Sequence, residues 1–289
     1  MGFFYQDGFR FYEKERKTIV IDDKKLESYI TYINYNQIKS IGLNGLYYHQ
    51  TDVNFLEKCP HIEEVNINDS LIIDHSKLYS LKNLKILSFD EPKKELDLSV
   101  FSNTLEELYI EHNKHVKKIE TCVNLISLII WKYKPESKNL EGLINLKQLQ
   151  ELSIIQGNVT SLKGSRAFIK LVKLEICYLR NFKYIDEVEN NSKTLQSITF
   201  EHCRKIENHS YVACLKELKT LHLSSCGDIK NLKFVSELPK LKHLSFIDSN
   251  VIDGDITPCV GIDWVAFNNK RHYNRTFEEI NPNFESGLE

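Results

Sequence analysis

The sequence predicts a curved, right-handed α/β solenoid, in which stacked repeats place a parallel sheet on the concave face and short helices or loops on the convex face. The stretch from Leu105 to Asn113 reads Leu-x-x-Leu-x-Ile-x-x-Asn, and its frame occurs eleven times at intervals of 20 to 24 residues. The fourth and sixth positions are apolar in every copy. One such strand cannot bury its apolar face alone, so the recurrence indicates stacked units that share a core.

The copies are predicted to span residues 38–267, and each begins with Leu or Ile. They open at Ile38, Ile62, Leu84, Leu105, Leu125, Leu149, Leu171, Leu195, Leu218, Leu241 and Ile262. Alternation such as that of Leu174 with Ile176 predicts a strand with one buried face. The segments 211–217 and 234–240 predict a helical turn before the next strand.

Residues 1–37 are predicted to form an N-terminal cap, because terminal repeats must close the open side of the core. Residues 9–11 and 18–21 have the character of strands on either side of a charged turn, and apolar residues at helical spacing follow them. Ile19 and Ile21 stand where an irregular additional copy would place its apolar pair. Residues 268–289 are expected to be a C-terminal cap and tail, and the whole chain one continuous domain. Three apolar residues of the tail are expected to cover the last strand edge: Tyr273, Phe277 and Ile280.

Over residues 38–267 the chain resembles the leucine-rich-repeat family. The ninth position, where that family prefers Asn or Cys, is Asn113, Cys203 and Cys226 in three copies and other residues, Ser249 among them, elsewhere. The chain is therefore similar to degenerate, stand-alone members of bacterial type. The resemblance implies recognition of a protein partner and says little about its identity.

Composition excludes several classes. With 42% hydrophobic and 27% charged residues the chain is neither disordered nor fibrous. A formal net charge of −2 gives no overall footprint for nucleic acid or an anionic membrane. The N-terminus lacks the apolar core of a secretory signal, and no apolar run is long enough to cross a membrane, so we expect a cytoplasmic chain. Seven cysteines without a C-x-x-C spacing predict buried thiols in a reducing compartment.

Positions two, three, five, seven and eight of each copy are predicted to line the exposed side of the sheet. Eleven strands at about 4.8 Å give a surface about 50 Å long, which suits a macromolecule better than a metabolite. In copies two to four this side carries eight acidic residues against Lys85: Glu63, Glu64, Asp69, Asp90, Glu91, Glu106, Glu107 and Glu111. A solvated charged face and the recognition of a basic partner both explain the acidic group, which argues against nucleic acid at this end.

Copies five to seven place apolar residues at the same outward positions: Ile126, Ile129, Trp131, Ile155, Val172, Cys177 and Tyr178. With Tyr109 beside them, they predict the apolar core of an interface next to the acidic group. The alternative is that the long return loop at residues 131–139 folds over them.

Copies eight to eleven are polar and include His202, His222 and His243. These histidines occupy positions eight, five and three, which strand geometry separates by about 8 Å or more, so we predict no metal site. No phosphate-binding loop, zinc-protease or serine-nucleophile motif occurs, and we predict neither enzymatic activity nor a cofactor.

The sequence thus favours a non-enzymatic protein-binding module that uses its concave face. The predicted partner-binding residues are Tyr109, Ile129, Trp131, Ile155, Tyr178, Glu64, Asp90, Glu106, Glu107 and Glu111. One alternative is an immunity or antitoxin protein that neutralises a basic toxin, for which the acidic group is the motive. A leucine-rich-repeat adaptor or effector is a further alternative.

Overall fold

The computed structural model describes residues 2–13, 17–68 and 71–283. The chain divides into two compact units, residues 1–130 and 131–289. Asp69, which we assigned to the acidic group, lies outside the described residues, as do residues 14–16 of the predicted charged turn.

The first unit is built on a sheet whose strands follow one another in chain order. Its strands are β1 (Phe3–Gln6), β2 (Phe9–Tyr12), β3 (Thr18–Val20), β4 (Ser40–Asn44), β5 (Glu64–Asn68), β6 (Ile86–Phe89) and β8 (Glu107–Glu111). β1, β2 and β3 pair antiparallel, whereas every pair from β3 to β8 is parallel. A short parallel ladder of β7 (Leu96–Asp97) and β9 (Val116–Lys117) lies apart from this sheet.

The N-terminal segment closes one end of the first unit. Strands β2 and β3 and helix α1 (Leu26–Asn36) confirm the predicted strands and the helical spacing, whereas the outer hairpin strand β1 was not predicted. Ile19 is in register with Ile41 of β4, as expected for an additional, irregular copy. The ring of Phe9 packs edge-on against buried Tyr29 of α1, with centroids 4.8 Å apart, which fixes the helix beneath the hairpin.

The second unit contains a parallel sheet in strict register. Its strands are β11 (Glu151–Gly157), β12 (Lys173–Cys177), β13 (Ser197–Glu201), β14 (Thr220–Ser224), β16 (His243–Ser245) and β18 (Trp264–Ala266). Their fourth-position residues form one row: Leu152, Leu174, Ile198, Leu221, Leu244 and Val265. A side ladder joins β15 (Asp228–Ile229) to β17 (Asn250–Val251). The boundary between the units falls within strand β10 (Ser127–Tyr133).

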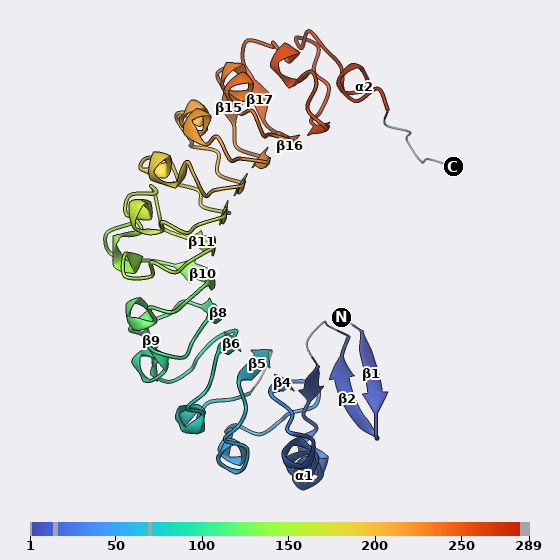
Figure 1. Cartoon of the computed structure of the whole chain (residues 1–289), viewed down its shortest axis with the longest axis vertical. Coiled ribbons are helices and arrows are strands. Elements are labelled where there is room, and N and C mark those ends of the chain that lie inside the picture. The colour runs from blue at the N-terminus through green and yellow to red at the C-terminus, as the bar shows by residue number, and fades with distance from the viewer. Residues whose placement is uncertain (1, 14–16, 69–70, 284–289) are drawn as a thin grey trace. The chain divides into compact units, whose positions relative to one another are not determined.

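Short 3-10 helices return the chain from one strand to the next, and in each unit they lie at the opposite edge from the strands (Figure 1). In the first unit they are η1 (Asp23–Lys25), η2 (Asn54–Lys58), η3 (Ser76–Ser80), η4 (Leu98–Phe101) and η5 (Ile119–Thr121). In the second they are η6 (Glu141–Leu143), η7 (Ser165–Ala167), η8 (Val188–Asn191), η9 (His209–Cys214), η10 (Lys233–Glu237) and η11 (Thr257–Cys259). The helical turns predicted at 211–217 and 234–240 are therefore present and begin one or two residues earlier. Over the described residues, no helix has both the length and the apolar character that a membrane crossing requires.

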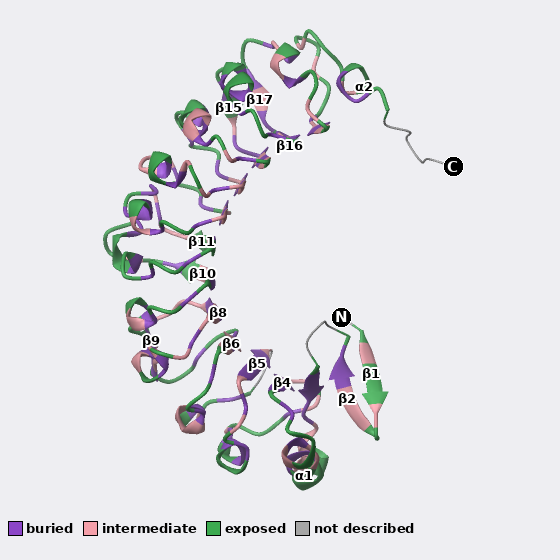
Figure 2. Ribbon diagram, viewed as in Figure 1, coloured by how far each residue is buried: buried purple, intermediate pink, exposed green. Residues whose placement is uncertain are grey.

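The core lies between the strands and the return helices, where the buried residues concentrate (Figure 2). The fourth and sixth residues of all eleven predicted copies are buried, from Ile41 and Leu43 to Val265 and Phe267. The alternation read from the sequence is confirmed, because a strand places successive side chains on opposite faces.

Four side chains at the ninth position tie their turns to the preceding copy. The amide of Asn113 donates to the carbonyl oxygen of Pro92 at 3.0 Å. The thiols of Cys203 and Cys226 donate to the carbonyl oxygens of Ile176 and Phe200 at 3.3 and 3.2 Å. The hydroxyl of Ser249 donates to Leu223 in the same way, although serine is not the family's preferred residue there. These bonds satisfy backbone groups inside the turns, where water does not reach.

In the second unit, the eighth residue of successive copies adopts a left-handed backbone conformation. These residues have φ between 52° and 62°, and they are Lys132, Gln156, Tyr178, His202, Ser225 and Asp248. Non-glycine residues rarely adopt this region, so its recurrence indicates a required turn. In copies seven to nine the left-handed residue directly follows the strand, as Tyr178 follows β12, His202 follows β13 and Ser225 follows β14.

The C-terminal segment covers the last strand. The side chain of Asn281, just after helix α2 (Phe277–Ile280), accepts a hydrogen bond from the Val265 amide at 3.0 Å and donates to the Val265 carbonyl at 2.8 Å. Phe277 packs edge-on against Trp264 of β18, with centroids 5.6 Å apart. Phe277, one of the three residues predicted to cover the last strand, thus packs on β18, whereas Asn281, which was not predicted to take part, bonds its edge.

Replacement of Gly157 by alanine is expected to destabilise the second unit by about 3 kcal/mol. Gly157 has a φ of +132°, and an added Cβ would lie 2.1 Å from the carbonyl oxygen of Tyr133. Gly261→Ala is the matched control, because φ is +89° there but nothing lies within 4 Å; we expect a loss of about 1 kcal/mol. Urea unfolding measures both, and equal losses would contradict the steric explanation.

The stability of the wild-type protein is expected to fall between pH 6.5 and pH 4 because of His209. Burial lowers the pKa of this histidine to about 4, and its Nε2 has no hydrogen-bond partner among the described residues. The unfolded chain therefore binds a proton in this range that the folded chain does not, which costs about 3 kcal/mol at pH 4 relative to pH 7. The difference in unfolding free energy between wild type and His209→Leu should change by about 3 kcal/mol between pH 7 and pH 4. A difference that stays constant would contradict the assignment of this pH dependence to His209.

Candidate functional site

The solvent-facing side of the strands, called here the strand face, carries the acidic group in the first unit. Glu64, Ile86 and Glu107 lie in one row across β5, β6 and β8. Asp90 is exposed, and Glu106, Glu107 and Glu111 are half-buried. Glu64 is only 8% exposed and accepts a hydrogen bond from the Asn66 side chain at 2.9 Å. It is therefore less available to a partner than its outward position suggested.

Lysines offset part of the acidic charge. Glu63 lies 3.1 Å from the ammonium groups of both Lys39 and Lys85, and its hydrogen bonds to them lower the pKa of its carboxyl group. These residues occupy the second position of successive copies, so lysine and glutamate alternate from strand to strand. They line a hollow of about 510 Å³ that also contains Lys17. This end of the strand face is of mixed charge rather than uniformly acidic.

The predicted neighbours Tyr109 and Ile129 lie on adjacent strands of the first unit. The amides of Ile126 and Ser127 donate to the carbonyl oxygen of Glu106 at 2.7 and 3.2 Å, the pattern found between β5 and β6. In that register Tyr109 stands beside Ile129. Both are half-buried, and the Tyr109 hydroxyl donates to Glu107 at 2.8 Å.

Trp131 and Ile155 belong to the strand face of the second unit. The amide of Asn158 donates to the carbonyl oxygen of Tyr133 at 3.1 Å, and this pairing places Trp131 beside Ile155. Ile155 is in turn in register with Cys177 of β12. Trp131, Ile155 and Cys177 are half-buried and form an apolar stripe across the strands.

Tyr178 does not belong to this stripe. Its left-handed backbone turns the side chain to the rim, where 47% of the residue is exposed. The ring lies against that of His202, with centroids 4.6 Å apart, and the hydroxyl donates to Glu201 at 2.9 Å. Tyr178 was predicted to lie with Trp131, because an alternating pattern does not reveal where a strand turns.

At the rim of the second unit, Tyr178 lines an open groove of about 900 Å³, called here the rim groove. Its lining residues are Lys132, Lys134, Gln156, Gly157, Tyr178, Arg180, Asn181, His202, Arg204 and Lys205. The lysines and arginines of the rim groove were not identified as site residues from the sequence, although they occupy regular positions in the repeat. They occupy the eighth, tenth and eleventh positions of copies five, seven and eight, and the tenth and eleventh were not considered as surface positions.

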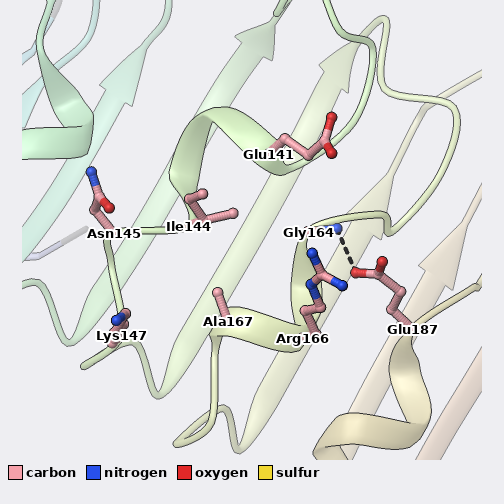
Figure 3. A pocket seen from close by; sticks show the side chains of 8 residues that line it. All are labelled: Glu141, Ile144, Asn145, Lys147, Gly164, Arg166, Ala167 and Glu187. Carbon is pink, nitrogen blue, oxygen red and sulfur yellow. Dashed lines mark hydrogen bonds between the residues drawn. The ribbon is translucent and has the colours of Figure 1, made fainter.

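A smaller hollow of about 320 Å³ lies between the return helices η6 and η7 of the second unit (Figure 3). The carboxylate of Glu187 accepts a hydrogen bond from the Gly164 amide at 2.7 Å, and Arg166 lies beside them. Glu141 is held by Lys163 at 2.9 Å. The hollow therefore carries charges of both signs, some of which are paired within the protein. These pairs connect neighbouring return turns, so we assign no charged binding site to the hollow.

The histidines and cysteines lie on several different strands and return turns of the described chain. Within the described ranges, no group of three or more His, Cys, Asp or Glu side chains is placed to hold a metal ion. His243 is in register with Thr220 and His222 with Ser245, so the two rings do not face one another across β14 and β16. All seven thiols are free and five are buried. Burial raises the pKa of Cys203 to about 11 and of Cys226 to about 12, which keeps both protonated as donors in the turns.

Removal of both lysines beside Glu63 is expected to raise the pKa of that carboxyl group towards its ordinary value. The double substitution Lys39→Ala and Lys85→Ala removes the two hydrogen bonds that lower it. Titration of the side-chain carboxyl carbon by NMR measures the pKa. Lys82→Ala, which removes an exposed lysine whose ammonium group bonds the Tyr79 carbonyl, is the control and should leave the pKa unchanged. An unchanged value in the double variant would contradict the pairing.

Comparison with known proteins agrees with the geometry. No protein-family model and no curated protein sequence matches the chain. Among solved structures, the internalin InlF of Listeria monocytogenes matches 89% of this chain and 87% of its own at 17% identity, with a TM-score of 0.51. The functional domain of InlJ from the same species, which includes a cysteine ladder, matches 81% of this chain and 59% of its own at 16% identity and a TM-score of 0.51. A leucine-rich-repeat protein of Leptospira interrogans matches 73% and 61% at 18% identity and a TM-score of 0.50. Together with the eleven-copy frame and the parallel strands, these likenesses show that the chain has the leucine-rich-repeat fold.

Proposed function

We propose that the protein is a non-enzymatic binding module and that its strand face, the face predicted to be concave, binds a protein partner. The apolar stripe of Trp131, Ile155 and Cys177 carries this proposal. Soluble proteins place polar side chains at such outward strand positions, and contiguous apolar residues there are typical of interfaces. Large aromatic side chains contribute most to the affinity of an interface, so Trp131 is the expected centre.

The first unit supports the same role with different chemistry. Tyr109 and Ile129 add apolar surface, while Asp90, Glu106, Glu107 and Glu111 place carboxylates on or beside β6 and β8. Charged residues at the edge of an interface speed association and select the partner.

The carboxylates also support a second candidate, neutralisation of a basic toxin by an immunity protein, although the lysines bound to Glu63 reduce the local charge. The free thiols support a reducing, cytoplasmic location.

The double variant Trp131→Ala with Ile155→Ala is expected to lose at least tenfold in binding to its partner, which is about 1.4 kcal/mol or more. Affinity capture from the native lysate, followed by quantitative mass spectrometry, identifies the proteins that wild type retains. Titration calorimetry with the purified partner then measures the affinity. The control is Ile169→Ala with Tyr211→Ala, because these residues are 60% and 53% exposed but lie on the return segments. Equal affinities for the two variants would contradict the proposal.

A basic toxin as the partner would add a charge signature. The double substitution Glu106→Gln with Glu107→Gln should then slow association more than it speeds dissociation. The difference in association rate between this variant and wild type should shrink between 50 and 300 mM salt, because screening removes long-range steering. Surface plasmon resonance on the captured partner measures both rates. An association rate that neither the substitutions nor salt alter would exclude this candidate.

A further inference from the structure

The rim groove of the second unit concentrates positive charge on a protein whose formal net charge is −2. Five lysine and arginine side chains line it together with His202, and none of its lining residues is acidic. A cluster of like charges is unfavourable unless an anion compensates it. The lining of the groove carries charge of one sign only.

The fold repeats these cations at regular positions along the rim. Lys134, Arg180 and Arg204 occupy the tenth position of copies five, seven and eight, two residues beyond the left-handed turn. Strands about 4.8 Å apart place the first two about 10 Å from each other and the last two about 5 Å apart. The row thus matches an extended ligand that carries several negative groups, rather than one small anion.

The protein itself does not neutralise this row. Lys173 and Lys183, on the same copies but outside the groove, are paired with Glu175 and Glu207 at 3.0 and 2.7 Å. By contrast, the side chains of Lys134, Arg180 and Arg204 form no hydrogen bond or ion pair within the described chain, and all three are exposed. Lys205 donates to Asn181 at 2.8 Å, which holds its ammonium group in the groove.

Neighbouring carboxylates decide between two extended anions. Single-stranded nucleic acid also suits cations beside an aromatic ring, but it follows a positive track over several nucleotides and stacks successive bases on aromatic side chains. Here the Tyr178 hydroxyl is bonded to Glu201, and Glu175 lies one strand away on the strand face. These two carboxylates interrupt the positive track that a long phosphate backbone would follow, whereas a short acidic peptide needs only the row of Lys134, Arg180 and Arg204. Arginine also binds carboxylates through two parallel hydrogen bonds.

We propose that the rim groove binds an extended acidic peptide segment of the partner protein, with Arg180 and Arg204 as its principal carboxylate-binding residues. This proposal rests on the proposed function and adds the chemistry of one partner segment. Apolar contacts on the strand face would then supply affinity, while the rim groove would select partners that carry a run of Asp or Glu.

The test uses fluorescence anisotropy of the full-length protein with a fluorescein-labelled peptide of ten glutamates, at 50 and 150 mM salt. Wild type is expected to bind and to lose affinity as salt rises, because exposed charges are screened. Arg180→Glu with Arg204→Glu should weaken binding at least tenfold, and Arg180→Gln with Arg204→Gln should weaken it less. The matched control, Lys193→Glu with Lys242→Glu, makes the same change in net charge at exposed residues outside the groove and should keep affinity within about twofold of wild type. Circular dichroism melting curves ensure that each variant is folded.

Three results would overturn the proposal: no peptide binding by folded wild type, equal weakening in the groove and control variants, or tighter binding of a ten-nucleotide deoxythymidine strand that the groove variants abolish. The strand-face variant Trp131→Ala with Ile155→Ala separates the two proposals. It should retain peptide binding while it loses the captured partner. If this variant still captures the partner, the proposed function of the strand face is wrong. If the variant loses the partner but wild type does not bind the peptide, only the assignment of the rim groove is wrong.

Discussion

Every parallel strand in this protein exposes backbone donors and acceptors on both of its edges, and the rest of the structure depends on how they are satisfied. Between copies, the next strand does so in register. At the N-terminal end, the antiparallel strand β2 pairs with β3, and β1 pairs with the other edge of β2. At the C-terminal end, one side chain, that of Asn281, bonds both the amide and the carbonyl of Val265. An amide side chain has the donor and acceptor of a peptide group, so it replaces one residue of a missing strand.

The division between strand face and rim gives the second unit two surfaces of different chemistry from one repeat. Odd-numbered strand positions present Trp131 and Ile155, whereas the residues after the left-handed turn present Arg180 and Arg204. The first unit differs, because its described eighth residues, Gly45, Glu91 and His112, are not left-handed. Two of its lysines, Lys39 and Lys85, are paired with Glu63. Substitutions on one surface can therefore alter recognition without disturbing the core, which lies on the opposite face of the same strands.

Local patterns were sufficient to predict the fold. Alternation placed all the fourth and sixth residues correctly, and helical spacing located α1. The patterns failed where the decisive partner is distant. Tyr178 was assigned to the apolar stripe because its turn depends on φ at the strand end, which the alternation does not encode. Glu63 was counted as free charge although Lys39, on the preceding copy, binds it. Aligning the copies by position, instead of reading each in turn, shows both the lysine–glutamate alternation and the tenth-position cations.

The left-handed turn at the eighth position has a consequence for how such a protein diverges. The same backbone accommodates Lys, Gln, Tyr, His, Ser and Asp there, so selection can exchange rim chemistry freely while the buried rows stay apolar. Only a minority of each repeat is constrained by the fold, and even those positions accept any of several aliphatic residues. Proteins can thus share this architecture while they differ at most positions of the sequence, as the likeness at 16 to 18% identity to InlF, InlJ and the Leptospira protein illustrates.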